Sequence, residues 1–134
     1  MESIRLMLDF GVVILIWIVQ LVIYPSFLHF SIDGLKVWHR SYAKNISYLV
    51  APLMLTQLGI HASLGYYQPG LLNHLTLLLI LLNWGLTFGW AVPLHARIEN
   101  GTEINYVSTK LVSMNKYRTF LWTLVFLITL FQSI

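Results

Sequence analysis

The sequence predicts an all-α integral membrane protein: one bundle of four membrane-spanning helices with both termini on the outer side. Of its 134 residues, 57% are hydrophobic and 10% are charged, whereas soluble domains carry about 25% charged residues. The apolar residues form four continuous runs, and each is long enough for the roughly 20 residues that a spanning helix needs. The basic residues gather at one end of these runs. This pattern excludes a soluble enzyme, a disordered chain and a multidomain protein.

The four apolar runs define the predicted spans and make a single domain over residues 1–134. They cover about residues 6–30, 46–65, 71–96 and 111–134. The first run carries Glu2 and Asp9 at its front and no small-x-small cleavage site after it, so we interpret it as a span rather than a signal peptide. The chain has no cysteine, which excludes disulfides and thiolate metal sites.

Three short connections join the spans. Residues 31–45 contain the turn signal Asp33-Gly34, and then aromatic residues at helical spacing. We expect a short interfacial helix here, with Trp38 and Tyr42 as anchors at the headgroup level. Residues 66–70 predict a tight turn, and residues 99–103 predict a polar turn before the fourth helix.

The basic residues predict the orientation. Arg5 lies alone on one side, and the other basic residues lie in or beside the first and third connections: Lys36, Arg40, Lys44, Arg97, Lys110, Lys116 and Arg118. Because such residues favour the cytoplasmic side, we expect these connections inside and both termini outside. The predicted location is a membrane, crossed several times, as in a bacterial inner-membrane protein. Membrane lipid is an expected partner and nucleic acid is not.

Each span also carries polar residues that share one helical face. They are Asp9, Gln20 and Tyr24 on the first span; Gln57 and His61 on the second; Thr76, Asn83, Thr87 and Trp90 on the third; and Asn115, Arg118, Trp122 and Thr129 on the fourth. Polar groups in a membrane face the bundle interior or a cavity. We therefore expect a polar seam, with Asn83, Thr87 and Trp90 facing inward and Leu79 and Leu86 facing lipid or a neighbouring helix.

Arg118 is the strongest functional candidate. It lies near the cytoplasmic start of the fourth span, and no carboxylate lies inside a span at that depth. Its partner is then a carbonyl, a lipid phosphate or an anionic ligand, unless the side chain extends to the headgroups. Asn115 lies one turn before it and faces the same way. His39 and His95 belong to the same end of the bundle, so the four residues are expected around one pocket.

The histidines show none of the spacings that mark metal sites, and we predict no metal and no cofactor. A pair of histidines on facing helices remains an alternative as haem ligands.

Three short pieces of the chain suggest a family. They are Trp38-His39 with Tyr42, Val92-Pro93-Leu94-His95, and Asn115 with Arg118-Thr119 and Trp122. Through these pieces and its span count, the chain resembles small four-span bacterial membrane proteins of unknown function, distantly similar to the anthrone oxygenase-like family. The resemblance implies oxidation of a polyphenolic substrate without an established metal, with His95 as a base and Asn115 and Arg118 as ligand-positioning groups.

The predicted function is the binding of a hydrophobic ligand with a polar or anionic head in a cavity open to the cytoplasmic side. If the protein is an enzyme, the expected reaction is a cofactor-free oxidation of an aromatic or quinol-like molecule, with His95 or His39 removing a proton. The expected ligand-binding residues are Arg118, Asn115, Trp90, Trp122, Tyr42, Gln57 and Thr87.

Two other functions stay open. The first is a non-catalytic accessory or scaffold subunit of a larger membrane complex or a homo-oligomer, which Gly85 and Gly89 on the third span would suit. The second is a haem-binding electron carrier.

Overall fold

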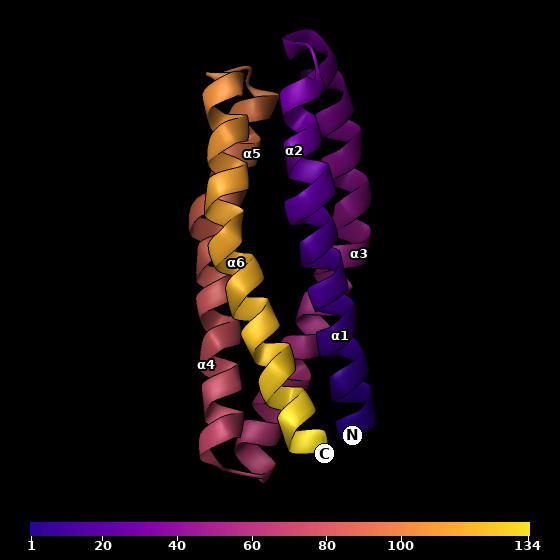
Figure 1. Ribbon diagram of the computed structural model, residues 1–134, viewed down its shortest axis with the longest axis vertical. Coiled ribbons are helices and arrows are strands. Elements are labelled where there is room, and N and C mark those ends of the chain that lie inside the picture. The colour runs from indigo at the N-terminus through magenta and orange to yellow at the C-terminus, as the bar shows by residue number, and fades with distance from the viewer.

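Four long antiparallel helical segments make up the computed structural model, which describes residues 1–134 (Figure 1). The predicted all-α, four-helix architecture is confirmed. The elements are α1 (Glu2–Ile18), η1 (Val19–Ile23), α2 (Tyr24–Ser26), η2 (Phe27–His29), α3 (Ile32–Tyr67), α4 (Leu71–Leu86), η3 (Thr87–Ala91), α5 (Val92–Glu99) and α6 (Ile104–Ser133). Three continuous helical stretches are long and apolar enough to cross a membrane: Glu2–His29, Ile32–Tyr67 and Leu71–Glu99.

Both chain termini lie at the same end of the bundle, at the bottom of Figure 1. We call this end, which also holds residues 68–70, the terminal end. The opposite end holds the turns at residues 30–31 and 100–103, and we call it the basic end. The turn before α6 is tight, because Gly101 and Glu103 both adopt the left-handed backbone conformation (φ 73° and 47°). Glu103 also forms an ion pair with Arg97.

The first connection differs from the prediction. Residues 32–45 do not form a separate interfacial helix; they are the first part of α3, which continues to Tyr67. The Asp33-Gly34 pair lies in the first helical turn, because the Ser31 side chain caps the helix by accepting a hydrogen bond from the Gly34 amide at 3.2 Å. No helix-breaking residue follows until Pro52, which α3 accommodates within its length.

Two π-helical turns interrupt the first and third segments, and each comes just before a proline. Tyr24, which precedes Pro25, donates its amide to the Val19 carbonyl, and Val92, which precedes Pro93, donates to the Thr87 carbonyl. Proline has no amide hydrogen and displaces the preceding turn. The wider turns absorb that disturbance without ending the helices, and such π-turns are frequent at functional sites.

A buried carboxylate ties the four segments together near the terminal end. Asp9 of α1 is 1% exposed. It accepts hydrogen bonds from Gln57 Nε2 of α3 and from Thr129 Oγ1 of α6 at 2.6 Å, and it lies 3.1 Å from His61 Nε2. The other His61 nitrogen, Nδ1, lies 3.1 Å from Thr76 Oγ1 of α4. This cluster, the Asp9 layer, therefore has a member on every segment.

The Arg5 side chain closes the bundle beyond the Asp9 layer. It is buried, and its Nη1 donates to Asn73 Oδ1 and to Gln132 Oε1, each at 3.3 Å. Gln132 in turn donates to Asn73 at 2.9 Å. On the other side of the Asp9 layer the buried apolar side chains include Val12, Ile16, Ile80, Trp122 and Val125.

On the third segment, the orientation of some side chains differs from the prediction. Asn83 is fully buried, as expected, but Leu79 is also buried, at 7% exposure, so its predicted position toward lipid is wrong. Trp90 is 41% exposed, and its ring lies edge-on to Tyr117 at 6.3 Å instead of filling the interior. Trp90 lies within the π-turn at Thr87–Ala91, which breaks the 3.6-residue period on which its prediction rests. Leu79 precedes Asn83 by four residues in the regular helix α4, so the two share one buried face.

We predict that Asp9→Ala destabilises the folded protein by about 3–5 kcal/mol, because buried donors lose their common acceptor. Unfolding by denaturant in detergent micelles, followed by circular dichroism, measures the effect. Asp33→Ala is the control: it removes an exposed carboxylate from α3 and is expected to change stability by about 0.5 kcal/mol or less. Equal stability of the two variants would contradict the role of the Asp9 layer.

Candidate functional site

A cavity of about 580 Å³ lies in the half of the bundle toward the basic end. Its walls come from α3 on one side, the α4–η3–α5 segment on the other, and α1 and α6 behind. The lining is mostly hydrophobic and includes Trp84, Phe88 and Trp122, with a few polar side chains among them. Size and lining are those of a small-molecule site.

The cavity exists because two segments meet at both ends and separate between them. Near the terminal end α3 packs on α4, where a Cβ at Gly65 would lie 3.6 Å from Leu77. Near the basic end α3 meets α5 through His39 and His95. Between these contacts α3 presents Ala43, Ser47 and Ala51 to the cavity, small side chains at four-residue intervals that leave the space unfilled.

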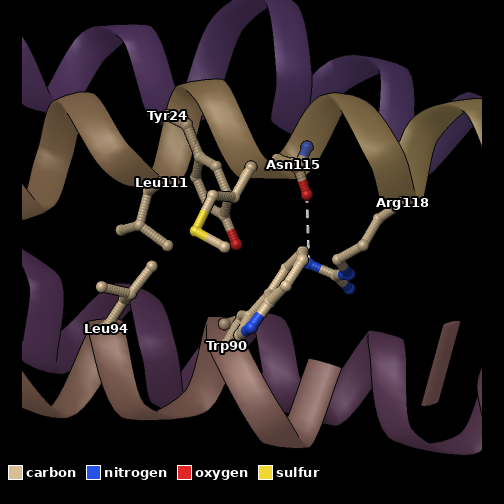
Figure 2. A pocket seen from close by; sticks show the side chains of 8 residues that line it. Tyr24, Trp90, Leu94, Leu111, Asn115 and Arg118 are labelled. Atoms are coloured by element: carbon tan, nitrogen blue, oxygen red, sulfur yellow. Dashed lines mark hydrogen bonds between the residues drawn. The ribbon is translucent and has the colours of Figure 1, made fainter. Parts of the chain in front are cut away.

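Arg118 brings a buried positive charge to this cavity. Its side chain is 9% exposed, and its Nη1 donates to Asn115 Oδ1 at 3.1 Å (Figure 2). Asn115 in turn donates to Gln20 Oε1 at 3.0 Å, and Gln20 donates to the Val112 carbonyl at 3.2 Å. The polar chain from η1 to α6 therefore holds one edge of the guanidinium in place.

The other edge of the guanidinium has no partner. Arg118 Nε is buried without a hydrogen bond, Nη1 alone donates to another side chain, and no carboxylate lies within ion-pair distance. Trp84, which also lines the cavity, has a buried indole N–H without an acceptor. Buried polar groups are almost always hydrogen-bonded. Other buried polar atoms also lack partners, among them Gln57 Oε1 and Asn83 Oδ1, but Arg118 and Trp84 are the ones that line the cavity.

A second polar chain leads from the cavity to the basic end. The Tyr24 hydroxyl lies 2.8 Å from His95 Nε2, and His95 Nδ1 lies 2.6 Å from His39 Nε2. His39 Nδ1 lies 3.5 Å from Glu99 Oε1, within ion-pair distance but without a hydrogen bond. Tyr24, His95 and Glu99 line the cavity, His39 is fully buried behind them, and the Glu99 side chain is 41% exposed.

Aromatic rings fix His39 in this chain. Phe27 and Tyr42 lie edge-on to its imidazole at centroid distances of 5.7 and 6.0 Å, and to each other at 5.5 Å. Such edge-to-face contacts are the favoured geometry of aromatic pairs. The ring is therefore held while its two nitrogens stay in line with His95 and Glu99.

Comparisons of the chain with protein-family models, with curated proteins and with solved structures give no match. The resemblance to the anthrone oxygenase-like family and the oxidation that it implies stay predictions.

The structure brings most of the predicted site residues to this region. His95, Arg118, Trp122, Tyr42 and Thr87 line the cavity. Asn115 and Trp90 line a smaller hollow beside it, together with Tyr24 and Arg118 (Figure 2). His39 lies behind His95 and outside the cavity wall. Gln57 lies elsewhere, because it belongs to the Asp9 layer.

Sequence reasoning did not include Tyr24, Glu99 or Trp84 in the site. Tyr24 lies on the polar face of the first span, but its tie to His95 depends on how two π-turns bring α2 and α5 together. Glu99 was assigned to a turn, and it is the last residue of α5, where its carboxylate reaches His39. Trp84 follows Asn83 directly, so it falls on another face of the helix than the polar residues of the third span.

The two histidines contact each other directly, and no group of three or more histidine, cysteine or acidic side chains is arranged to hold a metal ion. A haem between histidines stays a prediction. What this arrangement can do chemically is bind an acceptor oxygen at Arg118 and exchange protons through Tyr24 and His95.

The Glu99 carboxylate, 3.5 Å from His39 Nδ1, favours a proton on that nitrogen. We predict that His39 and His95 are neutral and protonated on Nδ1, so that Tyr24 donates to His95 Nε2. Nitrogen–proton NMR correlations of the histidine rings measure the tautomers, with exposed His29 as an internal reference. Tyr24→Phe should shift His95 Nε2, because it loses its donor. Protonation on Nε2 in both rings would contradict the assignment.

Proposed function

We propose that this chain is a membrane protein that binds a hydrophobic ligand with a polar or anionic head in the cavity. The three long apolar helical stretches support the membrane location, as do the many large apolar side chains exposed on the outside of the bundle, among them Phe10, Leu21, Leu82 and Phe131. A bundle of this kind in water would expose an apolar surface that soluble monomers avoid.

The observation that carries the ligand proposal is the unpaired guanidinium of Arg118. A buried charge without a counter-ion is costly, and inside a membrane such a residue is a functional candidate by default. Here the charge lines a cavity of ligand size, beside apolar walls and the free indole N–H of Trp84. A ligand with an oxygen acceptor at its head and an apolar body satisfies all of these groups.

The position of the cavity favours a ligand that comes from the bilayer. The residues on its rim at α3, Ala51 and Leu55, and those at η3 and α5, Phe88 and Val92, are exposed on the side of the bundle. The proposed route therefore passes between α3 and α5, through the space left by the small side chains of α3. A molecule dissolved in the membrane reaches Arg118 by this route without crossing water.

We predict that the purified protein retains an amphiphilic molecule that is lost in Arg118→Met. Removing the guanidinium deletes charge-assisted hydrogen bonds, which is expected to weaken binding about 10- to 100-fold. Solvent extraction of the purified protein followed by mass spectrometry measures the retained molecule. Ala51→Phe, which fills the cavity, should have the same effect.

Two controls match these variants. Arg40→Met removes an exposed arginine near the same end of the bundle, and Ala62→Phe enlarges an exposed alanine of α3 away from the cavity. Both should retain the molecule. If neither the wild type nor the controls retain one, and a partner protein co-purifies in equal amount, the scaffold function replaces the proposal.

We also predict that the terminal end faces outward and the basic end faces the cytoplasm. Gln68→Cys and Thr102→Cys place one exposed thiol at each end, in a chain without cysteine. Because positive residues stay inside, an impermeant maleimide added to intact cells should label position 68 and leave position 102 unlabelled until the membrane is opened. The reverse pattern would contradict the orientation.

A further inference from the structure

The second polar chain connects the cavity to the basic end through three hydrogen-bonding groups and a carboxylate. All of its members face one another across helix boundaries: Tyr24 on α2, His95 on α5, His39 on α3 and Glu99 at the end of α5. Every one of its groups can both give up and receive a proton. A purely structural link between these helices would not need titratable groups at each step.

We infer that the ligand is a weak oxygen acid, a carboxylic acid on an apolar chain, which binds as its anion at Arg118 while Tyr24, His95 and His39 pass its proton to Glu99. This inference rests on the proposed function, because it requires a ligand in the cavity. It adds the chemical class of the head group and a role for the second polar chain.

The edge of the Arg118 guanidinium that does not contact Asn115 has the geometry to bind a carboxylate. Arg118 Nη1 donates to Asn115 and Arg118 Nε is buried without a hydrogen bond, while the Tyr24 hydroxyl lies close enough to interact with the guanidinium. Nε and Nη2 point to the same side of a guanidinium and form the fork that binds the two oxygens of a carboxylate. The protein supplies no carboxylate to this fork, so the ligand would supply it.

The membrane explains why the acid must lose its proton inside the site. A carboxylate is costly to move through a hydrocarbon layer, so the acid enters in its neutral form. Arg118 favours the anion once the head group arrives. The released proton then needs a path, and Tyr24 and His95 line the cavity, as do Tyr42 and Glu99.

The hydrogen positions of the chain suit this transfer. The ligand O–H bond breaks and its proton goes to the Tyr24 oxygen, while the Tyr24 hydroxyl proton goes to His95 Nε2. The His95 Nδ1 proton goes to His39 Nε2, and the His39 Nδ1 proton goes to Glu99. Glu99, partly exposed at the basic end, releases a proton to water. One neutral acid becomes one bound anion and one released proton. When the ligand leaves, the same transfers in reverse order restore the original hydrogen positions of the second polar chain.

Dodecanoic acid and its methyl ester are suitable probes, applied to the full chain purified in neutral detergent. Tryptophan fluorescence reports binding, because Trp84 and Trp122 line the cavity. A pH-indicator dye in weakly buffered solution reports proton release in stopped-flow mixing. The Arg118→Met protein at the same detergent concentration gives the baseline for acid that enters the micelle. We expect the acid to bind and to release a proton, and the ester to bind at least about tenfold more weakly.

His39→Gln tests the relay apart from the binding. Glutamine keeps a polar side chain between His95 and Glu99, but it has no second ring nitrogen through which a proton can pass. We expect the affinity for dodecanoic acid to change by less than about threefold, and proton release to slow by at least about tenfold. Glu99→Gln should slow proton release in the same way. Because Glu99 is exposed, this substitution should not impair folding. His29→Gln, an exposed histidine at the same end, should leave the rate unchanged.

The outcomes separate the two proposals. If no retained molecule is found and neither probe binds, the ligand-binding function fails. If both probes bind equally well, or if Arg118→Met binds the acid as well as wild type, the anionic head group is wrong. If the acid binds through Arg118 but its proton is released equally fast in His39→Gln and Glu99→Gln, the relay is overturned while the binding function stands.

Discussion

Buried polar groups in an apolar bundle must find partners within the protein or in a ligand, and this constraint organises the whole structure. The Asp9 layer meets it in large part, because donors from α3 and α6 converge on one carboxylate and His61 extends the link to α4, although Gln57 Oε1 has no partner. The Arg118 region obeys it only in part, because one edge of the guanidinium and the Trp84 indole have no acceptor. One half of the bundle is thus closed by its own side chains, and the other half is open to a ligand.

The two halves also differ in backbone. Both π-turns lie at the depth of the cavity, and Val19, Thr87, Phe88 and Ala91 of these turns line it. The prolines that follow allow the helices to continue while altering their register, which lets Tyr24 reach His95 across the bundle at 2.8 Å. In the half that holds the Asp9 layer the helices are regular α-helices. The fold therefore combines a fixed end with an end whose helices separate around a space.

The sequence predicted the features that depend on composition and on regular periodicity. Four helices and the buried positions of Asp9, Asn83 and Arg118 follow from apolar runs and from the cost of exposing polar groups. It failed at Trp90, which lies within the π-turn Thr87–Ala91, and at Leu79, which shares the buried face of α4 with Asn83 four residues later. The partners of Gln57 and of His39 could not be predicted either, because a polar residue shows which face it occupies and not which helix lies opposite.

The account depends most on the claim that the missing partner of Arg118 is a ligand. An experimental structure of the protein extracted in a lipid environment tests this directly. The account predicts density for an oxygen-bearing head group within hydrogen-bonding distance of Arg118 Nε and Nη2, continuing as an apolar body past Trp84 and Trp122 toward Ala51. An Arg118 side chain turned out of the bundle toward the lipid headgroups, beside a cavity without such density, would contradict it.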